Sequence, residues 1–134
     1  MLLEMPPRTY LTDGTYIYCC QYLVTFTTKY HRPVLKGAVV VRFRELLSAL
    51  EHTYGFKVNG LDIIPDRVSM VVDCNPRESI QTIVAGLKRN TATILRHEYP
   101  ELRTRLPCLW TRSALISTIG IADQLVIDKY CRKY

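Results

Sequence analysis

The chain has 134 residues, which suits one domain with a hydrophobic core of its own. With 48% hydrophobic and 22% charged residues it is not a disordered tail, and no apolar run approaches the roughly 18 residues that cross a bilayer. The net charge of +6 favours a polyanionic partner, and most of it lies after Pro76, where 10 Lys and Arg face 5 Asp and Glu.

The first half of the chain predicts a strand followed by a helix. We expect residues 1–14 to form a loose leader that precedes the folded body. Residues 15–29 are rich in Tyr, Val, Thr and Phe with an alternating pattern, which predicts one long strand ending at Tyr30-His31-Arg32-Pro33. Apolar residues then recur at helical spacing between Gly37 and Gly55, and Gly55 is a typical helix stop.

The second half predicts two strands, a helix, a further strand and a terminal helix. Residues 56–64 and 68–74 read as strands joined by a turn at Pro65-Asp66. Asn75 is the expected cap of the next helix, with Pro76 in its first position. A polar linker over residues 99–107 leads to a strand over residues 108–119, and Gly120 precedes a last helix that runs to Tyr134.

This order of elements is typical of one fold class. Strand, helix, strand, strand, helix, strand is the split βαβ, ferredoxin-like arrangement, here with an extra C-terminal helix. We therefore predict an α+β protein, a single domain over residues 1–134, with an antiparallel sheet and its helices on one face.

Sequence patterns for metal or phosphate chemistry are absent. The chain has no phosphate-binding Gly loop, no nucleophile elbow and no zinc-type spacing among its five cysteines, which indicate free thiols in a reducing cytoplasm. His31, His52 and His97 are not brought together by their spacing. Asp62 and Asp66 could hold a hard cation through oxygen, although pairing with arginines is the simpler interpretation.

One tyrosine has a distinctive setting. Tyr130 lies on the predicted terminal helix beside Lys129, Arg132 and Lys133, and neighbouring cations stabilise a phenolate. A basic surface also attracts the phosphate that such a nucleophile would attack. We expect the cations that contact this phosphate to come from the second half of the chain, namely Lys88, Arg89, Arg96, Arg103, Arg105, Arg112, Lys129 and Lys133. Among them, Arg89 and Arg96 lie two turns apart, on an outer face of the helix expected after Asn75.

Several segments resemble, in register, the single-tyrosine HUH transposases, small insertion-sequence enzymes that cut and rejoin single-stranded DNA. Pro65-Asp66-Arg67-Val68-Ser69 resembles the family's Pro-Asp-His-hydrophobic-His motif, and Asp128-Lys129-Tyr130 resembles its nucleophile helix, here within residues 121–134. The other matching segments are residues 21–35, 86–88, 109–113 and 116–120.

The resemblance implies a covalent reaction at Tyr130 and a particular assembly. The family's tyrosine attacks a DNA phosphate, while two histidines and a Gln four residues after the tyrosine hold Mg²⁺ or Mn²⁺. The family acts as a homodimer that reads hairpin ends of single-stranded DNA. Each of its sites combines the histidines of one subunit with the tyrosine helix of the other.

The sequence departs from the family where the metal ligands belong. Arg67 and Ser69 stand at the two histidine positions, and Tyr134 stands at the Gln position. Arginine cannot ligate a cation, and serine is a weak neutral ligand. We therefore expect Mg²⁺ or Mn²⁺ binding to be weak or absent and cleavage to be impaired. Arg67 could instead hold the phosphate directly.

Two alternatives stay open on the sequence alone. The chain could be a DNA-binding module without catalysis, in which Tyr130 carries no chemistry. It could also be a ferredoxin-like dimer with a partner other than DNA and an incidental basic face.

Overall fold

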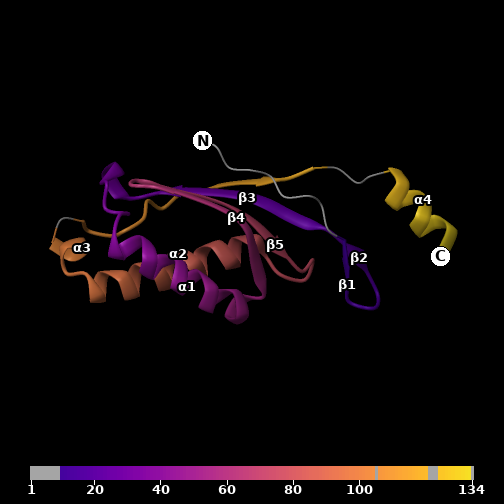
Figure 1. Ribbon diagram of the computed structural model, residues 1–134, viewed down its shortest axis with the longest axis horizontal. Coiled ribbons are helices and arrows are strands. Elements are labelled where there is room, and N and C mark those ends of the chain that lie inside the picture. Colours follow the sequence, from indigo (N-terminus) through magenta and orange to yellow (C-terminus); the bar gives the residue numbers. More distant parts are fainter. Residues whose placement is uncertain (1–9, 105, 121–123, 134) are drawn as a thin grey trace.

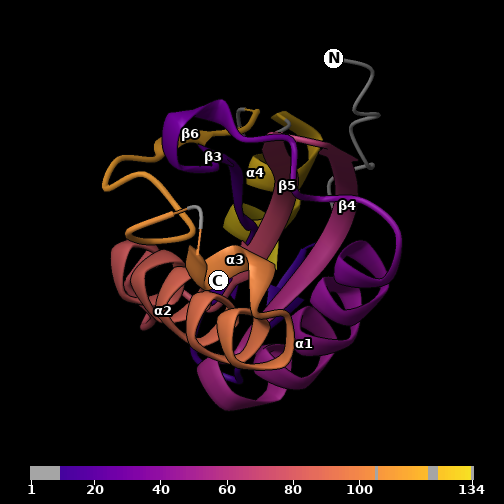
Figure 2. The same ribbon diagram turned by 90° about the vertical axis from the view of Figure 1, so that its left-hand side faces the viewer.

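A four-stranded antiparallel sheet covered on one face by two helices forms the body of the protein. The computed structural model describes residues 10–104, 106–120 and 124–133 (Figure 1). The strands run in the order β4-β5-β3-β6, with β3 at Cys20–Thr27, β4 at Phe56–Ile64, β5 at Arg67–Cys74 and β6 at Leu115–Thr118. Helices α1 (Ala38–Tyr54) and α2 (Ile80–Glu98) lie side by side beneath this sheet (Figures 1 and 2). The predicted α+β fold with helices on one face is confirmed.

The alternating pattern of β5 separates the core from the other face of the sheet. Val68, Met70 and Val72 are fully buried and belong to the core formed with the helices, whereas Arg67 and Ser69 occupy the alternate positions and so point to the opposite face. Strand register sets Arg67 beside Thr27 and sets Ser69 between Thr25 and Asp62.

Trp110 anchors the segment before β6 in the core. Its ring meets Phe26 edge-on with centroids 4.8 Å apart and lies 5.8 Å from the ring of Phe43. Its indole Nε1 donates to Thr91 Oγ1 at 3.1 Å, so the polar edge of the buried ring has a partner. These contacts join the segment to β3, α1 and α2.

The single strand predicted over residues 15–29 is wrong in its first part. Residues Ile17–Tyr18 (β2) pair with Leu11–Thr12 (β1) in a separate small hairpin, and the main strand begins only at Cys20. Asp13 stabilises the hairpin turn, since its carboxylate accepts from the backbone N–H groups of Thr15 and Tyr16. Part of the segment expected to be a loose leader is therefore paired, and the rest of it lies outside the described residues.

The start predicted for the second long helix is also wrong. Ser79 caps α2, accepting from the Thr82 N–H at 3.4 Å. Asn75 instead accepts from the Arg77 N–H at 2.8 Å, so it stabilises a turn that precedes the helix. The helix therefore begins at Ile80, later than Pro76.

The predicted last strand is much shorter than expected. Leu115–Thr118 forms a strand against β3. Earlier in the segment, Trp110 makes an isolated bridge with Thr28, and the Thr111 N–H donates to the Thr27 carbonyl at 3.0 Å, while the Trp110 side chain is buried in the core. The polar linker contains the short helix α3 (Glu101–Thr104), and α4 spans Gln124–Lys133. Within the described residues, no helix has the length and apolar character needed to cross a membrane.

Candidate functional site

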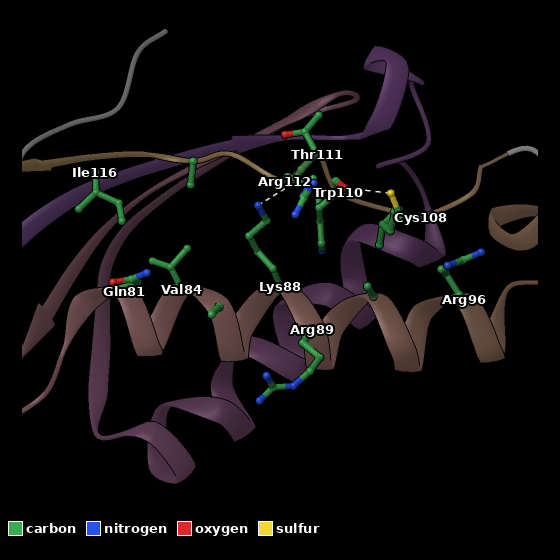
Figure 3. A pocket seen from close by; sticks show the side chains of 14 residues that line it. Gln81, Val84, Lys88, Arg89, Arg96, Cys108, Trp110, Thr111, Arg112 and Ile116 are labelled. Atoms are coloured by element: carbon green, nitrogen blue, oxygen red, sulfur yellow. Dashed lines mark hydrogen bonds between the residues drawn. The ribbon is translucent and has the colours of Figure 1, made fainter.

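A groove lies between α2 and the irregular segment that carries Trp110. It has a volume of about 500 Å³, and Figure 3 shows the side chains that line it. Four predicted DNA-binding residues contribute to its wall: Lys88, Arg89, Arg96 and Arg112. The structure therefore brings together half of the eight predicted cations.

Lys88 crosses the groove instead of facing solvent. Its Nζ donates to the carbonyl oxygens of Thr111 at 2.6 Å and Ser113 at 2.9 Å, and it lies 5.8 Å from the centre of the Phe26 ring. Burial lowers the pKa of this amine. Lys88 thus fixes the position of the segment that bears Arg112, and it presents little free charge to a phosphate.

The two arginines predicted to share an outer face of α2 differ in exposure. Arg89 is exposed and lies on the side of α2 away from the Trp110 segment (Figure 3), with its Nη2 3.4 Å from the Tyr54 hydroxyl. Arg96 is half-buried and donates from Nη2 to the Leu106 carbonyl at 3.1 Å. Arg96 therefore also holds the linker, and the expectation of a matched outer pair is wrong.

The remaining predicted DNA contacts are scattered over the surface. Arg103 and Lys129 are exposed on α3 and on α4, respectively, whereas Arg112, one of the four groove residues, is exposed on its rim. Arg105 lies outside the described residues, as does the side chain of Lys133. The exposed cations Arg89, Arg103 and Arg112 remain available for a DNA backbone.

The positions predicted to have lost a metal site lie at the start of β5. Arg67, Ser69, Asp62 and Ile64 line a small hollow of about 110 Å³ on the sheet face opposite the helices. Ser69 is buried, and its hydroxyl is 3.0 Å from the Thr25 hydroxyl. Arg67 is exposed.

This donor set does not fit the Mg²⁺ or Mn²⁺ that the family uses. One carboxylate and one hydroxyl that already has a partner are few oxygen ligands for a hard cation, and the guanidinium in the same hollow would repel it. Asp66 pairs with His31 at 3.3 Å. Within the ranges that the structure describes, no three His, Cys, Asp or Glu side chains are grouped to hold a metal.

Tyr130 lies on α4, far from this hollow within one chain. Its side chain is 51% exposed. In Figure 1, α4 is at one end of the molecule and the turn between β4 and β5 is at the other, and Figure 2 shows the same separation in depth. A single chain therefore does not bring Tyr130 to Arg67 and Ser69. Tyr134 lies outside the described residues.

Sequence reasoning missed a basic, aromatic turn beside the hollow. The short 3-10 helix η1 (Lys29–His31) follows β3 and contacts the β4–β5 turn through the His31–Asp66 pair. Its Tyr30 is 65% exposed, and Lys29 Nζ lies 5.2 Å from the centre of the Tyr30 ring. An aromatic residue flanked by cations directly after a strand was the available signal, but we interpreted it only as a strand end.

Comparisons with known proteins agree on one family. The family model described as IS200-like transposases matches residues 16–134. ISDra2 transposase TnpA of Deinococcus radiodurans is 28% identical over 117 residues, which are 86% of this chain and 84% of that protein.

Two solved structures share the fold. A crystal structure assigned to a transposase of Deinococcus radiodurans aligns with a TM-score of 0.76 at 24% identity, covering 92% of this chain and 96% of that one. The structure of a REP-associated tyrosine transposase bound to a REP hairpin aligns with a TM-score of 0.60 at 12% identity, covering 93% and 67%. Since the family model covers most of the sequence, the chain belongs to the IS200-like transposase family.

Proposed function

We propose that this protein binds hairpin ends of single-stranded DNA, with Tyr130 at the nucleophile position and with strand cleavage strongly weakened. The observation that carries the proposal is a contrast between two parts of the chain. The family match runs through Tyr130, whereas Arg67 and Ser69 give the hollow on β5 a donor set unsuited to a divalent cation.

Exposed cations and a structural relative support DNA hairpins as the ligand. Arg89 and Arg112 line the α2 groove and are exposed, and Arg103 is exposed on α3; guanidinium groups in such positions can contact phosphates. The REP-associated relative was solved with a hairpin bound. Because Lys88 and Arg96 are used to hold the protein itself, the proposed contact surface centres on the three exposed arginines.

The separation of Tyr130 from the β5 hollow supports a homodimer as the working unit. One chain holds these features at opposite ends (Figure 1), so a second copy would have to supply the tyrosine. Strand β6 forms an edge of the sheet and its four residues are exposed, including Leu115 and Ile116. Such an exposed apolar edge is suited to pairing with another chain.

The proposed reaction is a phosphoryl transfer to the Tyr130 phenol. The phenol oxygen loses its proton and attacks the scissile phosphorus, the phosphorus bond to the leaving DNA oxygen breaks, and that oxygen takes up a proton. The products are a phosphotyrosine and a free DNA hydroxyl. Tyr130 is exposed to a substrate, but the donor set on β5 is unsuited to a divalent metal ion that would stabilise the developing charge, which is why we propose slow cleavage.

A denaturing gel tests the catalytic part of the proposal. The parent protein and Tyr130→Phe would be incubated with Mn²⁺ and labelled single-stranded hairpins, with a native gel run in parallel. We expect both proteins to shift the hairpins on the native gel, with steep salt dependence. After denaturation we expect a faint adduct from the parent and none from Tyr130→Phe.

Three results would contradict parts of this proposal. An abundant adduct that disappears in Tyr130→Phe would show that cleavage is intact. Equal affinity for hairpin DNA and for a neutral polymer would remove DNA as the ligand and favour a ferredoxin-like dimer with another partner. If Tyr130→Phe behaves like its parent in every respect, the protein is a DNA-binding module without catalysis. The presence of Arg67 at a histidine position of the family also favours that alternative.

A further inference from the structure

The turn after β3 adopts a backbone conformation that its residues rarely take. Tyr30 and His31 have φ angles of 59° and 54°, the left-handed region, and neither is a glycine. An aromatic residue in this region is strained unless its surroundings compensate. Consecutive residues of this kind therefore need a structural or functional reason.

Backbone hydrogen bonds hold the turn firmly against the β4–β5 turn. Thr28 is fully buried, its N–H donates to the Asp66 carbonyl at 3.0 Å, and its hydroxyl donates to the Arg32 carbonyl at 2.8 Å. The His31 ring meets the Asp66 carboxylate at 3.3 Å. These contacts explain how the turn is fixed, but they involve the neighbours of Tyr30 and not its ring.

The Tyr30 side chain gains little from the conformation within the folded chain. It is 65% exposed, so the ring gains too little hydrophobic stabilisation to offset the backbone strain. The conformation instead presents a flat aromatic face to solvent at the end of the sheet. Backbone strain that is not offset by packing is characteristic of binding sites.

Cationic side chains lie on the same turn as Tyr30 and at the same end of the sheet. Lys29 Nζ lies 5.2 Å from the ring centre, and Arg32 is exposed at the end of the turn. Arg67 pairs in register with Thr27 and follows Asp66, so it lies at the same end of the sheet. Among the residues that the structure describes, the Arg67 guanidinium forms no ion pair. The surface formed by Lys29, Tyr30, Arg32 and Arg67 is named here the Tyr30 platform.

We propose that the Tyr30 platform binds an unpaired stretch of DNA next to the hairpin, with one base stacked on Tyr30 and the adjoining phosphates held by Arg67 and Arg32. An exposed aromatic ring among cations offers what a single strand presents, a free base face and a charged backbone. Duplex DNA has its base faces covered and could use only the charges. The proposal rests on the proposed function and adds the site of the unpaired strand.

Arg67 acquires a definite role in this arrangement. A guanidinium matches the geometry of a phosphate and carries a permanent charge. It would therefore bind the strand without any metal ion. The same residue that makes the hollow unsuited to a cation makes it suited to an anion.

Fluorescence anisotropy with two labelled probes tests the platform. One probe is a blunt DNA hairpin, and the other is the same hairpin with an unpaired tail that carries 2-aminopurine. The variants are Tyr30→Gly, Tyr30→Phe and Arg67→Gln. Tyr16→Gly is the matched control, since Tyr16 is 62% exposed on the β1–β2 hairpin, away from the platform (Figure 1).

The expected result is specific to the tail. Stacking is worth about 1–3 kcal/mol per base, so Tyr30→Gly should weaken binding of the tailed probe by about 5- to 150-fold and abolish 2-aminopurine quenching. Its affinity for the blunt hairpin should not change. Tyr30→Phe should keep the parental affinity, and Arg67→Gln should lower the slope of log K against log salt for the tailed probe by about one. Tyr16→Gly should match the parent.

A melting measurement separates binding from folding. Glycine adopts a positive φ without strain, so Tyr30→Gly should melt at or above the parental temperature. The platform is refuted if Tyr30→Gly keeps its affinity for the tail, or if it loses both probes together with thermal stability. If the parent binds the blunt hairpin but gains nothing from the tail, only the platform fails. If the parent binds neither probe, the proposed function fails with it.

Discussion

Lys88 Nζ donates to the Thr111 carbonyl at 2.6 Å, across 23 residues of sequence. A second bond from the same amine to the Ser113 carbonyl completes a clamp that holds the irregular segment to α2. Burial lowers the pKa of Lys88, because removing the charged ammonium from water carries a desolvation cost. Its contribution is therefore to the position of Arg112 and Trp110.

Replacing Lys88 by Met should destabilise the protein. The change removes both hydrogen bonds, leaving the Thr111 carbonyl without the Lys88 donor and the Ser113 carbonyl with the longer 3.4 Å bond from the Thr111 hydroxyl, at a cost of about 1–3 kcal/mol. Urea unfolding followed by circular dichroism would measure the loss. Lys129→Met, at an exposed position on α4, is the control and should unfold like the parent. Equal unfolding free energies for the two variants would show that the clamp contributes nothing.

Gly86 allows α1 and α2 to approach closely. A Cβ built at Gly86 would lie 2.4 Å from Cζ of Tyr54, whose hydroxyl accepts from Asn90 Nδ2 at 3.0 Å. Gly86→Ala should therefore destabilise the protein, although alanine favours a helix by up to about 1 kcal/mol. In a Tyr54→Ala background the same change should be stabilising, because the clash is gone.

Thermal melting of the four proteins in this cycle gives the coupling between the two positions. A coupling of about 1 kcal/mol or more is expected for residues in direct contact. If Gly86→Ala costs the same free energy in both backgrounds, the ring of Tyr54 is not what excludes the methyl group.

Restoring histidines on β5 should not by itself restore strong metal binding. Arg67→His with Ser69→His supplies two imidazoles, but Tyr134 still stands where the family has its Gln. Isothermal titration calorimetry with Mn²⁺ should show weak binding in the double variant and none in the parent. Strong binding by the parent would refute the ligand argument and direct attention to Asp62 and Asp66.

Cys74 should make the folded protein less stable at alkaline pH. Burial raises the pKa of this thiol from 9.0 to about 11. Above pH 9 the unfolded chain therefore loses the Cys74 proton while the folded protein retains it. By linkage, the stabilising contribution is complete below pH 9 and is lost as pH rises toward 11.

Melting temperatures between pH 8 and 11 test this effect. The parent should lose stability over that range more steeply than Cys74→Ala, whereas Cys131→Ala, at an exposed thiol, should follow the parent. Parallel curves for the parent and Cys74→Ala would mean that the thiol titrates alike in the folded and unfolded protein.

Local signals made much of the fold predictable. The helix between Gly37 and Gly55 could be predicted because its signals are local: apolar residues recur at helical spacing, and a glycine follows the last turn. Gly55 indeed has a φ of 69°, and its N–H bonds to the Glu51 carbonyl. The hairpin turn at Pro65-Asp66 was equally local. Such features depend on residues a few positions apart.

The features that could not be predicted from the sequence depend on contacts between residues far apart in the chain. Residues 108–114 look like a strand, but Trp110 bonds to Thr91 and Lys88 holds Thr111 and Ser113. For the site, the substituted Arg67 and Ser69 could be read from the motif. The φ angles of Tyr30 and His31 could not, because the bonds that impose them come from Asp66 on another turn.

The alternation along β5 has an evolutionary consequence. Val68, Met70 and Val72 carry the packing of this strand, and the residues between them face away from the core. Exchanges at Arg67 therefore leave the folded state nearly undisturbed, so selection for a stable chain does not preserve the chemistry of that position. A lineage can change what this face recognises while inheriting the same scaffold.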